Sequence, residues 1–515
     1  MKLAFLLLLA AGCNASSPSS APSAAAAPDS GGGSPTPVGD DAGIASDDAS
    51  PDGASQNDSS SGDPKFDAWA AVFDQERTSM NIPGCSVAVL DAGRIAYSRG
   101  FGTKGPGSTE PVDARTLYRI GSNTKALTAV ALLRLVDEGK VSLDGRVTDY
   151  VAGLAITGTE IGSVTLRDLL THQSGLSDDF VADASHDDSG LLAYFTGSQV
   201  TQDEYFMDPP GSFYDYSNPN FNLAGLVAEQ VSGVSYRQMM HDRVLAPLGM
   251  TRTFFLPSEA IADGDVSEGL TDGSYQVPAG RVAVDAYDNA WSRPAGYAFS
   301  NVLDYARFLQ FLYAGNTGVL SDGLRTAMQA PQVDTLDYGD VERYGFGVGN
   351  DVGFYLGNGY YATTLLSHGG LIPGYEANYF LLPAAGWGII AFCNSDASFP
   401  DTSFAEALQD LAPLPSPSAP PDVAPIPSTF AAMAGAYYDP YTVGHVSIAA
   451  TSAGLTISMP DVDAAGVTYD HALAPTTRDG FDFTFDGADT EVTFMKDSSG
   501  TYVWMRTRGF VAKRS

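Results

Sequence analysis

The stretch Ser122-Asn123-Thr124-Lys125 guides the interpretation of the whole chain. It opens a largely apolar run, residues 122–138, which predicts a helix closed by Gly139. Ser122 and Lys125 are three positions apart, so a helix places both side chains on one face. A lysine there can take the proton of the serine hydroxyl, which needs a base to become a strong nucleophile. The stretch therefore predicts an activated serine.

Two further motifs follow in sequence, Tyr216-Ser217-Asn218 and His368-Gly369-Gly370. Each is common by chance, but together with the first they resemble, in the same order, the three-part signature Ser-x-x-Lys, Ser-Asp-Asn and Lys-Thr-Gly. With Tyr at the head of the second motif and His at the head of the third, the chain resembles the serine β-lactamase and penicillin-binding superfamily. The resemblance is to the branch of class C β-lactamases, D-alanyl-D-alanine carboxypeptidases and related esterases.

Other segments extend this resemblance over roughly residues 64–411. They are 164–176 (VTLRDLLTHQSGL), 247–250 (PLGM), 304–308 (DYARF) and 344–347 (YGFG). The resemblance implies one fold, an α/β (α+β) sandwich with an antiparallel sheet, together with an all-helical lobe. It places the active site between the sandwich and the lobe. The order of predicted strands and helices fits an antiparallel sheet flanked by helices.

The resemblance also implies catalytic roles. Ser122 would attack a carbonyl and become an acyl-ester, and Lys125 would act as its base, with a pKa lowered by burial. Tyr216 would pass the proton between Ser122 and the leaving group, whereas Asn218 would bind the substrate amide and Lys125. The backbone N–H groups of Ser122 and Leu371 would form the oxyanion hole. The alternatives are a helix-capping serine, a solvated lysine, a packing tyrosine and a turn asparagine.

His368 is the most ambiguous of these residues, because a buried structural histidine would give the same sequence. The flanking Gly369 and Gly370 would let a substrate backbone approach the strand closely. A lysine here would be a permanent cation for a substrate carboxylate, whereas a histidine is mostly neutral at pH 7.5. If His368 is that cation, kcat/KM on a carboxylate substrate should fall as the pH rises through its pKa. The bulk of Leu371 and the histidine both weaken the antibiotic-hydrolysis interpretation.

The composition excludes some partners. A net charge of −34 argues against nucleic-acid binding. We expect no cofactor, because no Gly-rich phosphate loop is present, and no metal site. His186 lies among Asp183, Asp187 and Asp188 at a spacing that fits no zinc pattern, so we expect a solvated loop. His172 is expected to make a structural hydrogen bond.

The N-terminal segment predicts export. Residues 1–13 read as a signal peptide, and Ala10-Ala11-Gly12-Cys13 resembles a bacterial lipoprotein box with Cys13 as the lipidated residue. The alternative is an ordinary secretory signal with an incidental cysteine. Residues 14–64 predict a disordered tether. We therefore expect a protein of the bacterial cell envelope, lipid-anchored, periplasmic or secreted, that meets the membrane only through its anchor.

The rest of the chain divides into strand-rich segments. Residues 82–98 predict a hairpin, and 360–366, 376–382 and 387–393 predict three strands. After a catalytic domain at 65–411 and a Pro-rich linker at 412–427, residues 428–515 alternate with period two and predict a small β-barrel with no catalytic features. In the family's sheet the first and last strands are neighbours, which implies that Cys85 and Cys393 could form a disulfide. Two buried free thiols are the equal alternative.

These observations favour one function among three. The preferred hypothesis is a serine hydrolase that forms an acyl-enzyme on small amide, ester or peptide substrates, similar to a D-Ala-D-Ala carboxypeptidase or esterase. The first alternative is a β-lactamase of the class C type. The second is an inactive binding or sensor homologue, which the complete set of Ser122, Lys125, Tyr216 and Asn218 disfavours.

Overall fold

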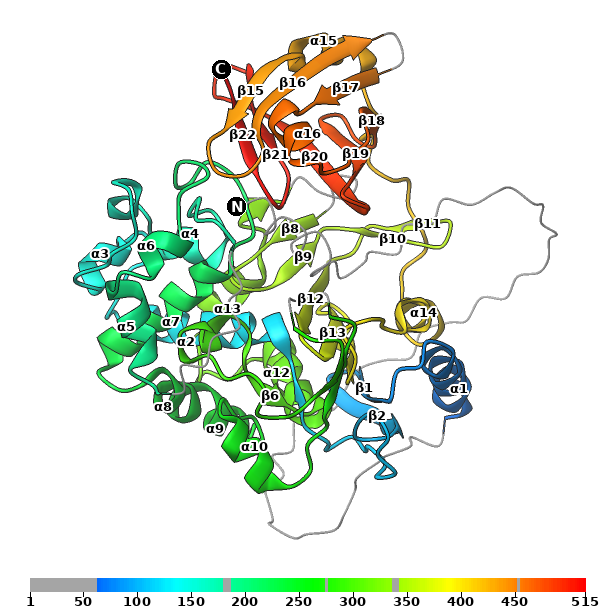
Figure 1. Cartoon of the computed structure of the whole chain (residues 1–515). Coiled ribbons are helices and arrows are strands. Elements are labelled where there is room, and N and C mark those ends of the chain that lie inside the picture. The colour runs from blue at the N-terminus through cyan, green and yellow to red at the C-terminus, as the bar shows by residue number, and fades with distance from the viewer. Residues whose placement is uncertain (1–62, 179–186, 274–276, 336–341, 452–453) are drawn as a thin grey trace, which may run out of the picture.

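The computed structural model describes residues 63–178, 187–273, 277–335, 342–451 and 454–515. Figure 1 shows a large body of helices and strands, with a smaller body formed by the C-terminal part of the chain beside it. The expected signal at 1–13, including Cys13, and nearly all of the expected tether lie outside the described residues. No helix within the described ranges is both long and apolar enough to cross a membrane.

An eight-stranded antiparallel sheet forms the centre of the large body. Its strand order is β2-β1-β14-β13-β12-β9-β8-β7, so the hairpin at the start of the chain lies against the last strand of this body. The strands are β1 (Gly84–Asp91), β2 (Arg94–Gly102), β7 (Val333–Asp334), β8 (Glu342–Tyr344), β9 (Gly349–Asp351), β12 (Leu365–Ile372), β13 (Tyr375–Leu382) and β14 (Trp387–Cys393). The short pairs β3 (Tyr118–Arg119) with β6 (Phe299–Ser300), β4 (Gly269–Thr271) with β5 (Gly280–Val282), and β10 (Phe354–Leu356) with β11 (Gly359–Tyr361) lie outside it.

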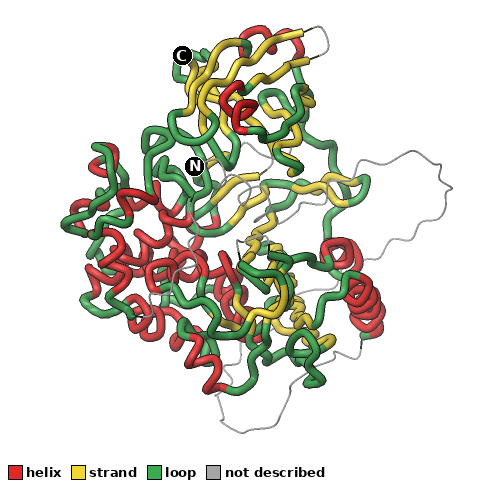
Figure 2. Tube along the Cα trace, in the orientation of Figure 1, coloured by secondary structure: helices red, strands yellow, loops and turns green. Residues whose placement is uncertain are grey.

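Helices cover both faces of the sheet. They are α1 (Pro64–Ser79), α2 (Thr124–Asp137), α3 (Val147–Tyr150), α4 (Leu166–Leu170), α5 (Gly190–Thr196), α6 (Val200–Asp203), α7 (Asn218–Ser232), α8 (Tyr236–Met240), α9 (Ala246–Leu248), α10 (Pro257–Asp263), α11 (Arg293–Gly296), α12 (Val302–Ala314), α13 (Asp322–Gln329) and α14 (Asp401–Asp410). Figure 2 shows that most of them gather on one side, whereas α1 and α14 lie on the other. This arrangement confirms the expected sandwich with a helical lobe.

The side-chain alternation of β1 explains the layers. Val87 and Val89 pack into a cluster with residues of α1 and α14, whereas Ala88 and Leu90 pack into a second cluster that includes α2 and α12. Successive residues of a strand point to opposite faces, so a strand buried on both sides is apolar throughout. Every residue of β1 except Asp91 is buried accordingly.

One strand prediction was wrong in its position. The apolar run 360–366 is divided: Tyr360 and Tyr361 end the separate β10–β11 hairpin, and the sheet strand β12 begins only at Leu365. His368 therefore lies in the middle of β12, where it pairs with Tyr379 of β13. Residues 360–366 contain neither Gly nor Pro, so the sequence contained no turn signal for the break.

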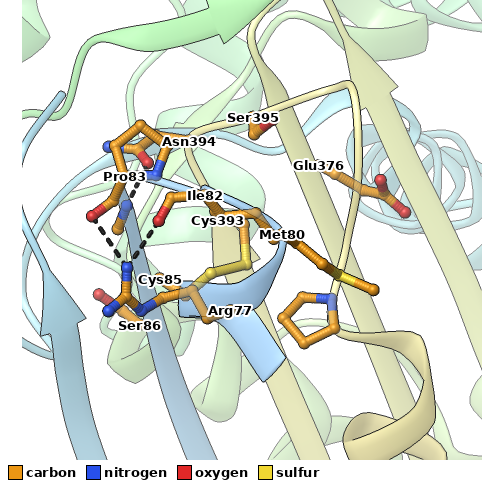
Figure 3. Close-up of a disulfide and its surroundings, with 12 residues drawn as sticks. Arg77, Met80, Ile82, Pro83, Cys85, Ser86, Glu376, Cys393, Asn394 and Ser395 are labelled. Carbon is orange, nitrogen blue, oxygen red and sulfur yellow. Dashed lines mark hydrogen bonds between the residues drawn. A yellow bond between two sulfur atoms is a disulfide. The ribbon is translucent and has the colours of Figure 1, made fainter. Parts of the chain in front are cut away.

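A disulfide joins Cys85 and Cys393, which are direct partners in the β1–β14 register. Figure 3 shows the bond between the start of β1 and the end of β14, close to Glu376. Both cysteines are fully buried. Arg77 of α1 donates to the carbonyl oxygens of Ile82 and Pro83 next to this bond, and so ties the entry of β1 to the helix.

The C-terminal body is a closed eight-stranded barrel, as expected. Its strands are β15 (Gly435–Asp439), β16 (Gly444–Thr451), β17 (Gly454–Ser458), β18 (Ala472–Pro475), β19 (Gly480–Phe485), β20 (Ala488–Lys496), β21 (Tyr502–Arg506) and β22 (Val511–Arg514), with α15 (Phe430–Met433) and α16 (Pro460–Ala465) beside them. An apolar core of its own fills the interior. Closure leaves the barrel without an open edge strand.

The barrel packs on the large body through an apolar cluster. Phe213 of the large body is buried with Met495 and Val511 of the barrel. Its ring centroid lies 6.0 Å from that of Trp504 in β21. Arg506 Nη1 donates to the backbone oxygen of Thr335 at 2.7 Å. These contacts place the β21–β22 turn beside the segment that carries Tyr216.

Candidate active site

The nucleophile candidate Ser122 lies in a short 3₁₀ turn, Gly121–Asn123, that leads into α2. Gly121 has φ +49°, and a Cβ there would lie 2.6 Å from the carbonyl carbon of Gly370. A Cβ on Gly370 would in turn meet the backbone oxygen of Ile120 at 2.0 Å. Two glycines thus let the backbone of β12 reach the serine turn, because neither position has room for a side chain.

Lys125 is fully buried and contacts three oxygens. Its Nζ lies 2.9 Å from Ser122 Oγ, 2.6 Å from Asn218 Oδ1 and 2.8 Å from the backbone oxygen of Ala295. Two of these oxygens belong to carbonyl groups, which can only accept. A neutral amine would satisfy both with its two N–H bonds and direct its lone pair at the serine hydroxyl. The arrangement therefore suits Lys125 as the base for Ser122.

Tyr216 approaches the same serine from a different element. Its hydroxyl lies 2.9 Å from Ser122 Oγ, and Lys125 Nζ is 5.0 Å from its ring centroid. The side chain is 8% exposed, so the phenol is at the boundary between the core and the site. Ser122 Oγ therefore has one hydrogen-bond partner from the first motif and one from the second.

Asn218 begins α7 and is held by Asp178. Its backbone N–H and its Nδ2 both donate to Asp178 Oδ1 at 2.9 Å. Since Nδ2 is the donor to Asp178, the Oδ1 of Asn218 faces Lys125. The sequence reasoning missed Asp178, which has no motif of its own and lies two residues after the 164–176 segment.

His368 is buried and neutral. Its Nδ1 lies 2.6 Å from the backbone oxygen of Gly369, and its Nε2 lies 3.0 Å from the hydroxyl of Tyr344. A carbonyl only accepts, so Nδ1 carries the proton and Nε2 accepts from Tyr344. Burial, and next the charge of Lys125, lower the pKa of His368 to about 3. Burial therefore disfavours His368 as the cation for a substrate carboxylate.

His172 supports the second motif. Its Nδ1 accepts from the backbone N–H of Ser217 at 3.1 Å, which is a structural hydrogen bond of the expected kind. The ring stacks on Tyr216 with centroids 4.2 Å apart. Burial, and next the charge of Lys125, hold the pKa of His172 well below its usual value. A neutral imidazole beside Tyr216 adds no competing charge to the site.

The oxyanion-hole candidates lie where β12 meets the serine turn. Gly369, Gly370 and Leu371 pair with Asn378, Ala377 and Glu376 of β13. Asn123 Nδ2 donates to the backbone oxygen of Ala377 at 2.8 Å and ties the serine turn to β13. The ideal Cβ of Gly121 would lie 2.7 Å from the nitrogen of Leu371. The structure thus brings the backbone of Leu371 next to the turn that carries Ser122.

Buried ion pairs hold α11, whose Ala295 accepts from Lys125. Arg293 is 2% exposed and pairs with Asp288 and with Asp188. Asp188 also pairs with Arg237. The expectation that this acidic loop is only solvated was wrong for Asp188, because it bridges two arginines far away in sequence. Asp183 and His186 lie outside the described residues.

The described residues contain no group of three or more His, Cys, Asp or Glu side chains arranged to hold a metal ion.

The barrel, expected to carry no catalytic features, does reach the site. The Cζ atom of Arg508, in the β21–β22 turn, lies 4.7 Å from the ring centroid of Tyr216. The sequence did not predict a site role for Arg508 or for Tyr344, although Tyr344 belongs to the 344–347 segment. Only the packing of distant segments brings these two residues to the motifs.

Known proteins share this architecture. Penicillin-binding protein 4 of Amycolatopsis lactamdurans is 28% identical over 389 residues, 72% of this chain and 98% of that protein. A crystal structure of SurE with D-Leu has a TM-score of 0.65 at 22% identity, covering 88% of this chain and 100% of the other. A class C β-lactamase has a TM-score of 0.56 at 21% identity, covering 68% and 96%.

The structural matches show the fold. The SurE match covers 88% of this chain, whereas residues 63–411 make up only about two thirds of it, so that match extends beyond the large body into the barrel. Residues 69–413 match the family described as Beta-lactamase. Because this match spans well over half of the sequence and contains all three motifs, the chain belongs to the β-lactamase family.

Proposed function

We propose that the protein is a serine hydrolase that forms an acyl-enzyme on Ser122 and acts on small amides or esters, in the manner of a D-alanyl-D-alanine carboxypeptidase. The observation that carries the proposal is the pair of 2.9 Å contacts that Ser122 Oγ makes with Lys125 Nζ and with the Tyr216 hydroxyl. A nucleophile needs one partner to take its proton and another to deliver a proton to the leaving group.

The reaction follows from this geometry. The Ser122 proton passes to Lys125 as Oγ bonds to the substrate carbonyl carbon, and the carbonyl oxygen gains a negative charge. The backbone N–H groups of Ser122 and Leu371 stabilise that charge. The bond to the leaving amine or alcohol then breaks, and Tyr216 protonates it while Lys125 returns a proton to Tyr216. Water repeats the sequence on the acyl-ester, releases the acid and restores Ser122.

The neutral His368 supports a peptidase or esterase over a β-lactamase. A β-lactamase gains from a permanent cation at the head of the third motif, whereas burial keeps the pKa of His368 at about 3. The half-buried Leu371 narrows the same region. The relatives named above include a penicillin-binding protein as well as a β-lactamase, which fits an enzyme of cell-wall peptides.

We further propose a place for the enzyme at the bacterial cell envelope. The lipoprotein-like box ending at Cys13 and the polar segment 14–64 support an anchored or exported protein. The disulfide between Cys85 and Cys393 suits an oxidising compartment. We expect the wild type to incorporate radiolabelled palmitate and the Cys13→Ala variant to incorporate none. Equal incorporation in both proteins contradicts the anchor.

Covalent labelling tests the nucleophile. A fluorescent alkyl phosphonate should modify the wild type at Ser122, as located by peptide mass spectrometry, and leave Ser122→Ala unmodified. The variant should also lose about 10⁴-fold or more in kcat, because the nucleophile acts as a unit with its base. Ser499→Ala, an exposed serine of the barrel, is the control and should behave as wild type. An adduct on another residue would falsify the assignment.

A rate panel tests the substrate class. We expect the wild type to hydrolyse acetyl-D-alanyl-D-alanine and a nitrophenyl ester faster than a chromogenic cephalosporin. A cephalosporin rate well above both would instead make the protein a β-lactamase.

A further inference from the structure

The β21–β22 turn of the barrel places one arginine at the edge of the candidate active site. The Cζ atom of Arg508 is 4.7 Å from the ring centroid of Tyr216. Its Nη2 lies 3.5 Å from Asp178 Oδ2, on the carboxylate whose other oxygen holds Asn218. Arg508 thus contacts two residues that belong to, or support, the second motif, although it is about 290 residues away along the chain.

The turn that carries Arg508 is well formed. Thr507 Oγ1 accepts from the backbone N–H groups of Gly509 and Phe510 at 3.2 and 3.0 Å. The Thr507 N–H donates to the backbone oxygen of Phe510 at 2.9 Å. Next to the turn, Arg506 is held by Thr335 and Val511 is buried against Phe213. Packing of the barrel therefore presents Arg508 at a defined position.

The third motif supplies no cation for a substrate carboxylate. His368 is neutral. Lys125 is fully buried and already contacts Ser122, Asn218 and Ala295. The Arg508 side chain keeps 26% of its surface exposed, whereas Asp178 keeps 1%. Its positive charge also adds to burial in lowering the pKa of His368, which places it within electrostatic reach of the third motif.

The position of Arg508 indicates which part of a substrate it meets. Tyr216 is the group that protonates the leaving group in the mechanism above, so a cation against its ring lies on the leaving-group side. A guanidinium has five N–H donors in a planar fork, so one edge can face Asp178 while another binds a carboxylate in bidentate geometry. An amino-acid leaving group carries such a carboxylate next to the amine that Tyr216 protonates.

We propose that Arg508, supplied by the C-terminal barrel, binds the free carboxylate of the leaving group and makes the enzyme selective for substrates that end in a free amino-acid carboxylate. This inference rests on the proposed acyl transfer at Ser122 and adds the substrate class and the residue that reads it. Asp178 positions both Arg508 and Asn218, and so links carboxylate recognition to the second motif.

Paired substrates test the proposal on the full chain. In Arg508→Ala, kcat/KM on acetyl-D-alanyl-D-alanine should fall about 10- to 100-fold, the effect of a lost charge-assisted hydrogen bond. The C-terminal amide of the same peptide should change by less than about threefold, because it offers no carboxylate. Arg508→Lys should recover part of the loss, since it keeps the charge without the fork. Arg478→Ala removes an exposed barrel arginine and is the matched control.

A binding measurement separates this inference from the proposed function. Calorimetric titration with D-alanine and with D-alaninamide needs no turnover, and Arg508→Ala should weaken only the D-alanine complex. Equal losses for the acid and the amide would mean that Arg508 has a structural role. An unchanged D-alanine affinity in Arg508→Ala would place the carboxylate elsewhere. Absence of phosphonate labelling at Ser122 would overturn the proposed function, and the titration would still decide the role of Arg508.

Discussion

His368 illustrates how much of the site depends on the surroundings of a single side chain. As a free residue it would titrate near pH 6.5 and could serve as a cation in mildly acidic conditions. In the structure its two ring nitrogens contact the Gly369 carbonyl and the Tyr344 hydroxyl. Adding a proton would turn Nε2 into a donor facing a hydroxyl that already donates. These contacts hold His368 within the third motif as a neutral residue.

The neutral His368 predicts how stability changes with pH. The unfolded histidine gains a proton near pH 6.5, but the folded one stays neutral until its pKa of about 3. The unfolded state therefore binds more protons between these values, and the free energy of unfolding should fall as the pH decreases through this window. One such residue contributes at most about 1.4 kcal/mol per pH unit.

Thermal unfolding at pH 7 and pH 4.5 is the measurement. The pH-dependent loss should be smaller in His368→Gln than in the wild type. His445→Gln is the control, because His445 is an exposed barrel histidine. Identical pH dependence in His368→Gln and the wild type would mean that His368 is protonated in the folded protein.

At the scale of elements, the candidate site lies where three elements meet: the turn that leads into α2, the first residue of α7 and the middle of β12. The turn Gly121–Asn123 and β12 approach so closely that two glycines are required. Asn218 begins α7 directly after Tyr216, so the start of that helix sets the position of the second motif. The β1–β14 pairing joins the first hairpin to the sheet, and β12 lies two strands away from β14.

The disulfide predicts a measurable contribution of the β1–β14 pair. Cys85 and Cys393 are 308 positions apart, and in the chain-entropy model a cross-link that closes so long a loop removes unfolded-chain entropy worth roughly 5–6 kcal/mol at most. We expect a Cys85→Ser, Cys393→Ser double variant to unfold at a lower temperature than the wild type.

A thiol titration of denatured, unreduced protein provides the direct check. Neither Cys85 nor Cys393 should react, and reductant should lower the melting temperature of the wild type but leave the double variant unchanged. Two reactive thiols, located at these positions by peptide mapping, would show that the bridge does not form in the protein.

At the scale of the whole molecule, the barrel packs on the large body and brings Arg508 to the ring of Tyr216. Met495 is 6% exposed, but it packs with Phe213 of the large body and is not part of the barrel core. A charge at this position would be buried at the interface without a partner, whereas the two separate cores would keep their packing.

Met495→Glu should therefore separate the two bodies without unfolding either. We expect faster proteolysis within the 412–427 linker, a larger radius of gyration by X-ray scattering, and a fall in kcat/KM on acetyl-D-alanyl-D-alanine toward the value of Arg508→Ala. Ala449→Glu, which adds the same charge at an exposed position of β16, should change none of these. Unaltered scattering and activity in Met495→Glu would show that the interface tolerates the charge.

The sequence by itself determined the features that depend on short-range patterns. The Ser122–Lys125 spacing, the order of the three motifs and the period-two alternation after residue 428 predicted the family, the nucleophile and a barrel, because helix and strand geometry is local. Tertiary structure alone decided the charge state of His368, since burial and neighbouring cations set a pKa. It also decided where β12 begins, and that Asp178 and Arg508 meet Tyr216 and Asn218. Those contacts join residues far apart in sequence, and no local pattern encodes which distant surfaces pack together.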